Sequence, residues 1–163
     1  MVKGSHLEPL WKFLKINPNL AGLPFWEAYP TLRVGVLKLA DGCPFRCTYC
    51  SVPQVDPNFV PRPLERAHAE LDPLCKLGAE NIAFYDDALL FRAESLLATF
   101  LRKALEKNLQ IHFHTPNALN ARFMTKNLVR LMVQAGCKTL YLGYGAIKPS
   151  SPFYLWEHLK WIG

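Results

Sequence analysis

The chain places Cys43, Cys47 and Cys50 close together in the run Asp-Gly-Cys-Pro-Phe-Arg-Cys-Thr-Tyr-Cys, directly after a strand-like stretch. Cysteine thiolates are the usual ligands of iron–sulfur clusters. Three thiolates from one loop would hold three irons of a cubane [4Fe–4S] cluster and leave the fourth iron open. An open metal position is where chemistry takes place, as at a catalytic zinc. The spacing therefore predicts a cluster-binding loop with one reactive corner.

A structural zinc site is the alternative interpretation of these cysteines. Zinc wants four closed ligands, commonly as two separated pairs, and Cys75 and Cys137 offer no second closely spaced pair. Both are most simply small buried apolar residues. Arg46 would either favour the thiolate form of its neighbours or lie in solvent. The triplet favours a cluster over zinc.

Composition limits the class of protein. At 163 residues, half of them apolar, the chain fits one globular domain. The net charge of +6 would suit a phosphate-bearing partner, but the cations form no run of five, so nucleic acid is a minor hypothesis. An odd number of cysteines without a signal-like opening predicts a reducing, cytoplasmic setting. No apolar stretch approaches the roughly 18 residues of a membrane span.

Strands alternate with helices through the middle of the chain. Alternating apolar residues predict strands at 33–40, 81–85, 110–114 and 138–143. Apolar faces at helical spacing predict helices at 63–77, at 94–107, and from an N-cap at Thr125 to Gly136. Such alternation implies parallel pairing of the strands, and therefore an α/β fold.

The two ends of the chain differ from this pattern. Residues 1–31 alternate aromatics with prolines and predict an irregular leader with a short helix at 8–15, packed on the core. Residues 32–143 form the predicted core. The strand and helix pattern stops at 144–163, an aromatic tail that would cover an open sheet edge or stay disordered.

The C-x3-C-x2-C pattern, with an aromatic residue just before its last cysteine, resembles the radical S-adenosylmethionine (radical SAM) superfamily. The resemblance covers residues 32–143 and implies a partial parallel (β/α) barrel with about four of six βα units, in a truncated or frame-shifted member. It implies SAM at the open iron and a one-electron reductant of flavodoxin or ferredoxin type. SAM would be cleaved to a 5′-deoxyadenosyl radical that acts on an unknown substrate. The alternative is an incomplete, inactive iron–sulfur-binding fragment.

The resemblance also implies residues for SAM near the second predicted strand. Tyr49 stands where the family has an aromatic residue near the adenine. The stretch from Tyr85 through Asp86 to Asp87 stands where the family has an acidic motif for the SAM amino group, a task that suits either carboxylate. The alternative is that the Asp pair is only a turn and helix-entry signal.

Two further candidates follow the third predicted strand. His114 would stand at the mouth of the barrel, and either His114 or Asn117 could contact SAM or substrate. The alternative is a hydrogen-bonded structural histidine. About thirty residues precede the first strand, too few for a cobalamin-binding domain, so cobalamin is not expected within this chain.

Overall fold

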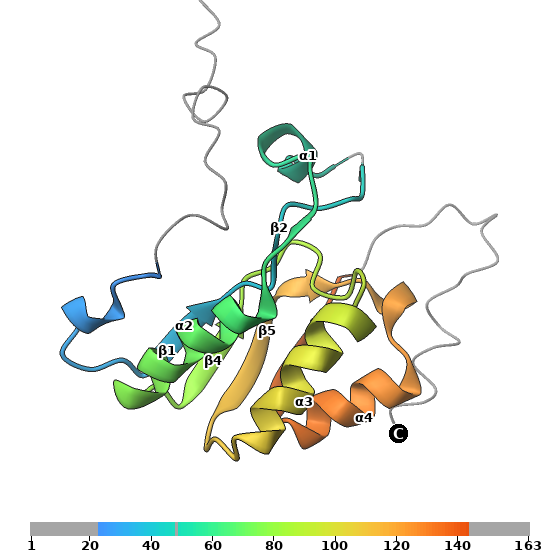
Figure 1. The fold of residues 1–163 in the computed structure, drawn as a ribbon. Coiled ribbons are helices and arrows are strands. Elements are labelled where there is room, and N and C mark those ends of the chain that lie inside the picture. The colour runs from blue at the N-terminus through green and yellow to red at the C-terminus, as the bar shows by residue number, and fades with distance from the viewer. Residues whose placement is uncertain (1–22, 48, 144–163) are drawn as a thin grey trace, which may run out of the picture.

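A parallel sheet of four strands, in the order β1-β4-β5-β6, forms the centre of the computed structural model, which describes residues 23–47 and 49–143 (Figure 1). The strands are β1 (Val34–Leu37), β4 (Asn81–Phe84), β5 (His112–Leu119) and β6 (Cys137–Leu142). Each pairs in parallel with its neighbour. The predicted α/β fold with a parallel sheet of four strands is therefore confirmed. The expected helix at 8–15 and the tail at 144–163 lie outside the described residues.

Three helices lie on one face of this sheet (Figure 1). They are α2 (Leu64–Lys76), α3 (Thr99–Glu106), which continues from the π-helical turn η3 (Glu94–Ala98), and α4 (Lys126–Gln134). Thr125 Oγ1 accepts a hydrogen bond from Leu128 N at 3.2 Å, which confirms the predicted N-cap. Gly78 and Gly136 follow α2 and α4 with φ of 88° and 87°, as residues that end helices often do. None of the described helices is long and apolar enough to cross a membrane.

The core lies between the sheet and these helices. Phe84 packs edge-on against Phe100 and face-on against Phe113, with ring centroids 5.8 and 5.2 Å apart. The predicted apolar faces of the helices are buried or half-buried here, except that Leu105 is 40% exposed. On the other face of the sheet Val36 is exposed. Within the described residues this face is more open than the helix side, although Ala83, the partner of Val36 on β4, is buried.

The first predicted strand is two elements. After β1 the chain forms β2 (Ala40–Asp41), which pairs antiparallel with β3 (Val60–Pro61) in a short ribbon. The segment between β2 and β3 contains the cysteines and the short helix α1 (Val52–Val55), and it extends beyond the edge of the sheet (Figure 1).

The third predicted strand is longer than its apolar alternation indicated. β5 continues past His114 to Leu119 and stays paired with β6 across two register shifts. Pro116 lies in the shifted stretch, where a residue without an N–H is tolerated. In the leader, η2 (Trp26–Ala28) is a 3-10 turn, and Trp26 packs against the core. Leu23, Phe25 and Tyr29 of the leader are exposed, so packing of the leader as a whole on the core stays a prediction.

Candidate functional site

The three cysteines share one loop, residues 42–51, between β2 and α1. We call this segment the cysteine loop. Within it, Cys50 N donates a hydrogen bond of 3.1 Å to Cys47 O. Cys43 and Cys50 are half-buried, Cys47 is exposed, and all three are free thiols. Because β1 leads into β2 and then into this loop, the thiols follow the carboxyl end of the first parallel strand.

Cys43 lies within electrostatic reach of Cys47 and Cys50. Burial raises the pKa of Cys43, and charges on Cys47, Cys50 and Asp87 raise it further. The predicted lowering by the exposed Arg46 therefore does not prevail at Cys43. Three neighbouring free thiols form a donor set that fits an iron–sulfur cluster. Among the described residues, no three His, Cys, Asp or Glu side chains, the three loop cysteines included, are gathered closely enough to hold a metal ion.

Gly42 closes the base of the cysteine loop. It has φ of 70°, a left-handed conformation that side chains other than glycine rarely adopt. A Cβ at this position would collide with the backbone carbonyl of Asn58, and the carbonyl oxygen of Asp56 would be 3.0 Å from it. The backbone of residues 56–58 can therefore approach the start of the cysteine loop this closely only because residue 42 is a glycine.

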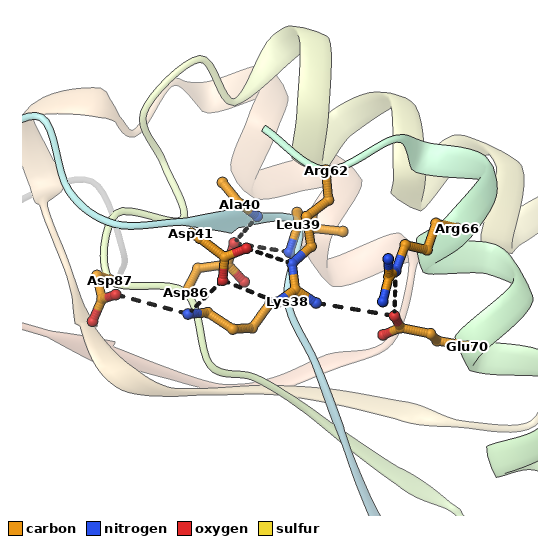
Figure 2. A network of polar contacts seen from close by, with 9 residues as sticks. All are labelled: Lys38, Leu39, Ala40, Asp41, Arg62, Arg66, Glu70, Asp86 and Asp87. Carbon is orange, nitrogen blue, oxygen red and sulfur yellow. Dashed lines mark hydrogen bonds and ion pairs between the residues drawn. The ribbon is translucent and has the colours of Figure 1, made fainter. Parts of the chain in front are cut away.

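Asp86 holds the strand that leads into the cysteine loop (Figure 2). Its Oδ1 accepts hydrogen bonds from Leu39 N at 2.9 Å and from Ala40 N at 2.8 Å. The side chain is buried, and Oδ2 finds no hydrogen-bond partner in the described part of the chain. Burial raises the pKa of Asp86 to about 6, although the two backbone hydrogen bonds act to lower it. Asp86 therefore links the end of β4 to the start of the loop.

Charged side chains surround this link (Figure 2). Arg62 donates to both carboxylate oxygens of Asp41, at 2.8 and 2.9 Å. Lys38 lies 3.0 Å from Asp41 and 3.9 Å from Asp87. Burial acts to raise the pKa of Asp41, but hydrogen bonds from Arg62 and Lys38 hold it below its ordinary value. Asp87 is 29% exposed, so its carboxylate is open to a ligand in a way that the carboxylate of Asp86 is not.

Three other predicted residues lie around this edge of the sheet. Tyr49 is 82% exposed, and the charge of Cys47 together with a hydrogen bond to it raises the pKa of the phenol, which places the hydroxyl beside that thiol. Tyr85, after β4, is exposed as well. Asn117 Nδ2 donates to the backbone carbonyl of Asp86 at 3.1 Å. The amide of Asn117 therefore reaches the segment that carries the acidic pair.

His114 lies elsewhere. One ring nitrogen is 2.8 Å from Asn81 Oδ1 and the other is 2.9 Å from Thr139 Oγ1, so the imidazole bridges β4, β5 and β6. Asn81 is the first residue of β4, at the end of the strand remote from the cysteine loop. The predicted place of His114 at the mouth of the barrel is wrong. The structure favours the alternative of a hydrogen-bonded structural histidine, and a role in SAM binding stays a prediction.

Sequence reasoning missed several residues that shape the site. Lys38 and Arg62 gave no signal, since Arg62 meets Asp41 across 21 positions of sequence. Phe45 did offer one, because an aromatic residue inside a loop of metal ligands needs a place to pack. The structure shows that place, a group of phenylalanines described below.

Together these features define a protein of α/β class, with a three-cysteine loop at the carboxyl edge of a parallel sheet. A family model described as the radical SAM superfamily matches residues 37–162, which is most of the chain. The chain belongs to the radical SAM superfamily. The family confirms the predicted kinds of cofactor, a [4Fe–4S] cluster and SAM, and its members are enzymes.

Curated relatives match parts of the chain. A ribosomal protein uS12 methylthiotransferase of Desulforamulus reducens is 35% identical over 66 residues, which cover 40% of this chain and 13% of the relative. An uncharacterized methyltransferase of Pyrococcus horikoshii is 27% identical over 117 residues, which cover 71% of this chain and 25% of the relative. The chain therefore spans a quarter or less of the length of these relatives.

Solved structures share the fold. The radical SAM methyltransferase TsrM of Kitasatospora setae, with its tryptophan substrate and a SAM analog bound, superposes with a TM-score of 0.66 at 18% identity. The match covers 76% of this chain and 24% of TsrM. A second TsrM structure, with cobalamin and a [4Fe–4S] cluster, gives a TM-score of 0.62 at 18% identity and covers 71% and 22%.

Proposed function

We propose that Cys43, Cys47 and Cys50 hold three irons of a [4Fe–4S] cluster and that SAM binds beside them at the carboxyl edge of the sheet. The observation that carries this proposal is the presence of three free thiols on one loop that follows the carboxyl end of the first parallel strand. Such a cluster, when bound, supplies the electron that splits SAM into methionine and a 5′-deoxyadenosyl radical, and it takes that electron from an external reductant of flavodoxin or ferredoxin type.

The chain's own residues would bind and orient SAM. Asp87 is the better candidate for the SAM ammonium group, because a partly exposed carboxylate can accept a charge-assisted hydrogen bond. Asp86 would have a positioning role rather than a direct contact with the ammonium group, because its Oδ1 already accepts two hydrogen bonds from the backbone. The exposed rings of Tyr49 and Tyr85 offer flat surfaces for the adenine. Asn117 would hold the backbone carbonyl of Asp86 in place through its hydrogen bond to it.

Iron binding tests the first half of the proposal. After anaerobic reconstitution with iron and sulfide, we expect the protein to hold about four irons per chain. Alanine at any of the three loop cysteines should remove most of this iron, because each thiolate holds a separate corner. Cys75→Ala is the matched control, a half-buried cysteine in α2. Unchanged iron content in the three loop variants would contradict the proposal.

SAM turnover tests the second half. The reduced protein should show an electron paramagnetic resonance spectrum that changes when SAM is added, and it should release 5′-deoxyadenosine. Asp87→Asn should weaken the effect of SAM on the spectrum while iron content stays at the wild-type level. A spectrum that ignores SAM, with no product released, would support the alternative of an inactive iron–sulfur-binding fragment.

A further inference from the structure

Four phenylalanine rings from separate segments meet beside the cysteine loop. Phe45 lies inside the loop, and Phe59 lies just before β3. Phe91 lies in the turn after β4, and Phe123 is the last residue of η4 (Ala121–Phe123), which follows β5. We call these four residues the phenylalanine cluster. It joins the loop after the first parallel strand to the loops after the second and third.

The rings are paired in favourable geometry. Phe45 stacks on Phe123 with centroids 5.5 Å apart and an interplanar angle of 27°. Phe91 meets Phe45, Phe59 and Phe123 edge-on at 5.7, 4.9 and 6.3 Å. Aromatic rings attract one another at such separations and angles beyond the effect of their buried area. Phe91 contacts all three other rings and is therefore the centre of the cluster.

The phenylalanine cluster connects the cysteine loop to the protein core. All four rings are half-buried, and Phe123 also packs against the apolar core below the sheet edge. The other fixed points of this region lie at the base of the loop, where Asp86 bonds Leu39 and Ala40. Phe45, by contrast, sits in the middle of the loop, between the first and second cysteines.

We propose that the phenylalanine cluster positions the cysteine loop and forms an apolar wall beside its thiols. Phe45 and Phe91 are positioning residues, since a hydrocarbon ring has no atom that could ligate iron. An apolar shell around a metal site restricts solvent access and thereby protects and tunes the site. The protective part of this inference rests on the proposed cluster binding, whereas the positioning part concerns the metal-free protein as well.

Trypsin cleavage of the metal-free protein measures the positioning. Arg46 is exposed in the cysteine loop, and exposed Arg33 before β1 serves as an internal reference site. Phe91→Leu keeps an apolar side chain but removes the ring at the centre of the cluster. We expect cleavage at Arg46, relative to Arg33, to become about fivefold faster or more, because lost ring contacts raise the population of the open loop. Phe25→Leu is the control, since that ring is 75% exposed.

Loss of iron–sulfur absorption from the reconstituted protein in air measures the protection that the apolar wall gives. Phe45→Leu should lose its iron–sulfur absorption in air about tenfold faster than wild type, the order of effect seen when groups around metal ligands are replaced. This variant also decides the proposal if Phe91→Leu does not fold. An Arg46 to Arg33 ratio within about twofold of wild type, together with unchanged bleaching in air, would overturn the inference. Wild type that takes up no iron would defeat the proposed function, while the cleavage ratio would still decide positioning.

Discussion

Asp86 is a buried acid whose charge is stabilised on one side only. Oδ1 receives two backbone N–H groups, while Oδ2 lies among atoms that offer it no hydrogen bond within the described chain. Lys38, just after β1, and Arg62, just after β3, favour the charged form, yet burial prevails and raises the pKa of Asp86 to about 6. The folded protein therefore holds this proton more tightly than the unfolded chain, in which the pKa is 3.8.

Because the pKa of Asp86 is higher in the folded protein than in the unfolded chain, the free energy of unfolding falls as the pH rises. The contribution of Asp86 to the free energy of unfolding is complete below the unfolded pKa of 3.8 and is lost as the pH rises through about 6. The size of the loss is up to about 3 kcal/mol. Asp86→Asn should remove this dependence, because an amide oxygen can accept the same two hydrogen bonds and never ionises.

Urea unfolding of wild type and Asp86→Asn at several values from about pH 4 to about pH 7 measures the effect. The difference in free energy of unfolding between the two proteins should shift in favour of the variant as the pH rises. Asp87→Asn, next along the chain and partly exposed, is the matched control. Parallel pH profiles for wild type and Asp86→Asn would show that the carboxyl group of Asp86 is not the group that titrates.

At the scale of elements, hydrogen bonds and ion pairs between charged side chains attach the ribbon of β2 and β3 to the rest of the molecule. Arg62, in the segment after β3, donates two hydrogen bonds to Asp41 of β2. Its Nη1 lies 3.9 Å from Glu70 Oε1 of α2. Glu70 is buried and also accepts a 3.0 Å hydrogen bond from Arg66. The two strands of the ribbon flank the segment that contains the cysteine loop and α1, so this network determines where that segment stands relative to α2.

Arg62→Met should therefore weaken the ribbon. We expect the free energy of unfolding to fall by about 1–3 kcal/mol, since the variant removes hydrogen bonds between charged groups that are partly buried. Arg102→Met is the control, because Arg102 and Glu94 form an ion pair at the surface, and such pairs contribute less than about 1 kcal/mol. Equal losses in the two variants, measured by urea unfolding, would show that the Arg62 pair gains nothing from its burial.

How far the sequence could predict these elements depends on their length and on the range of their contacts. Periodicity located the parallel strands and the helices, because each runs long enough to show a repeat. The two-residue strands β2 and β3 are too short to show one. The spacing of the cysteines was enough to predict a ligand loop. The hydrogen bonds of Asp86 could not be predicted, because they reach backbone N–H groups 46 and 47 positions away, and any residue type except proline has such a group. His114 was misplaced because its partners come from two other strands.

At the scale of the whole molecule, the site and the core occupy different parts of one sheet. The cysteine loop and the acidic pair follow the carboxyl ends of the strands, whereas the large buried side chains lie below them against α2, α3 and α4. Parallel sheets usually have both faces covered, so strand residues exposed on the face where the described residues place no helix are a departure from that rule. The stability of the described chain should come almost entirely from the helix-covered face.

Neighbouring residues on β1 test this one-sidedness, because they point to opposite faces of the same strand. Leu37 is 1% exposed and packs in the core, whereas Val36 is 37% exposed. Leu37→Ala should lower the free energy of unfolding by about 2–5 kcal/mol, through lost contacts and the cavity left behind. Val36→Ala should cost less than about 1 kcal/mol, as exposed substitutions do. Urea unfolding of both variants gives the comparison, and a loss at Val36 as large as that at Leu37 would mean that the second face is also covered.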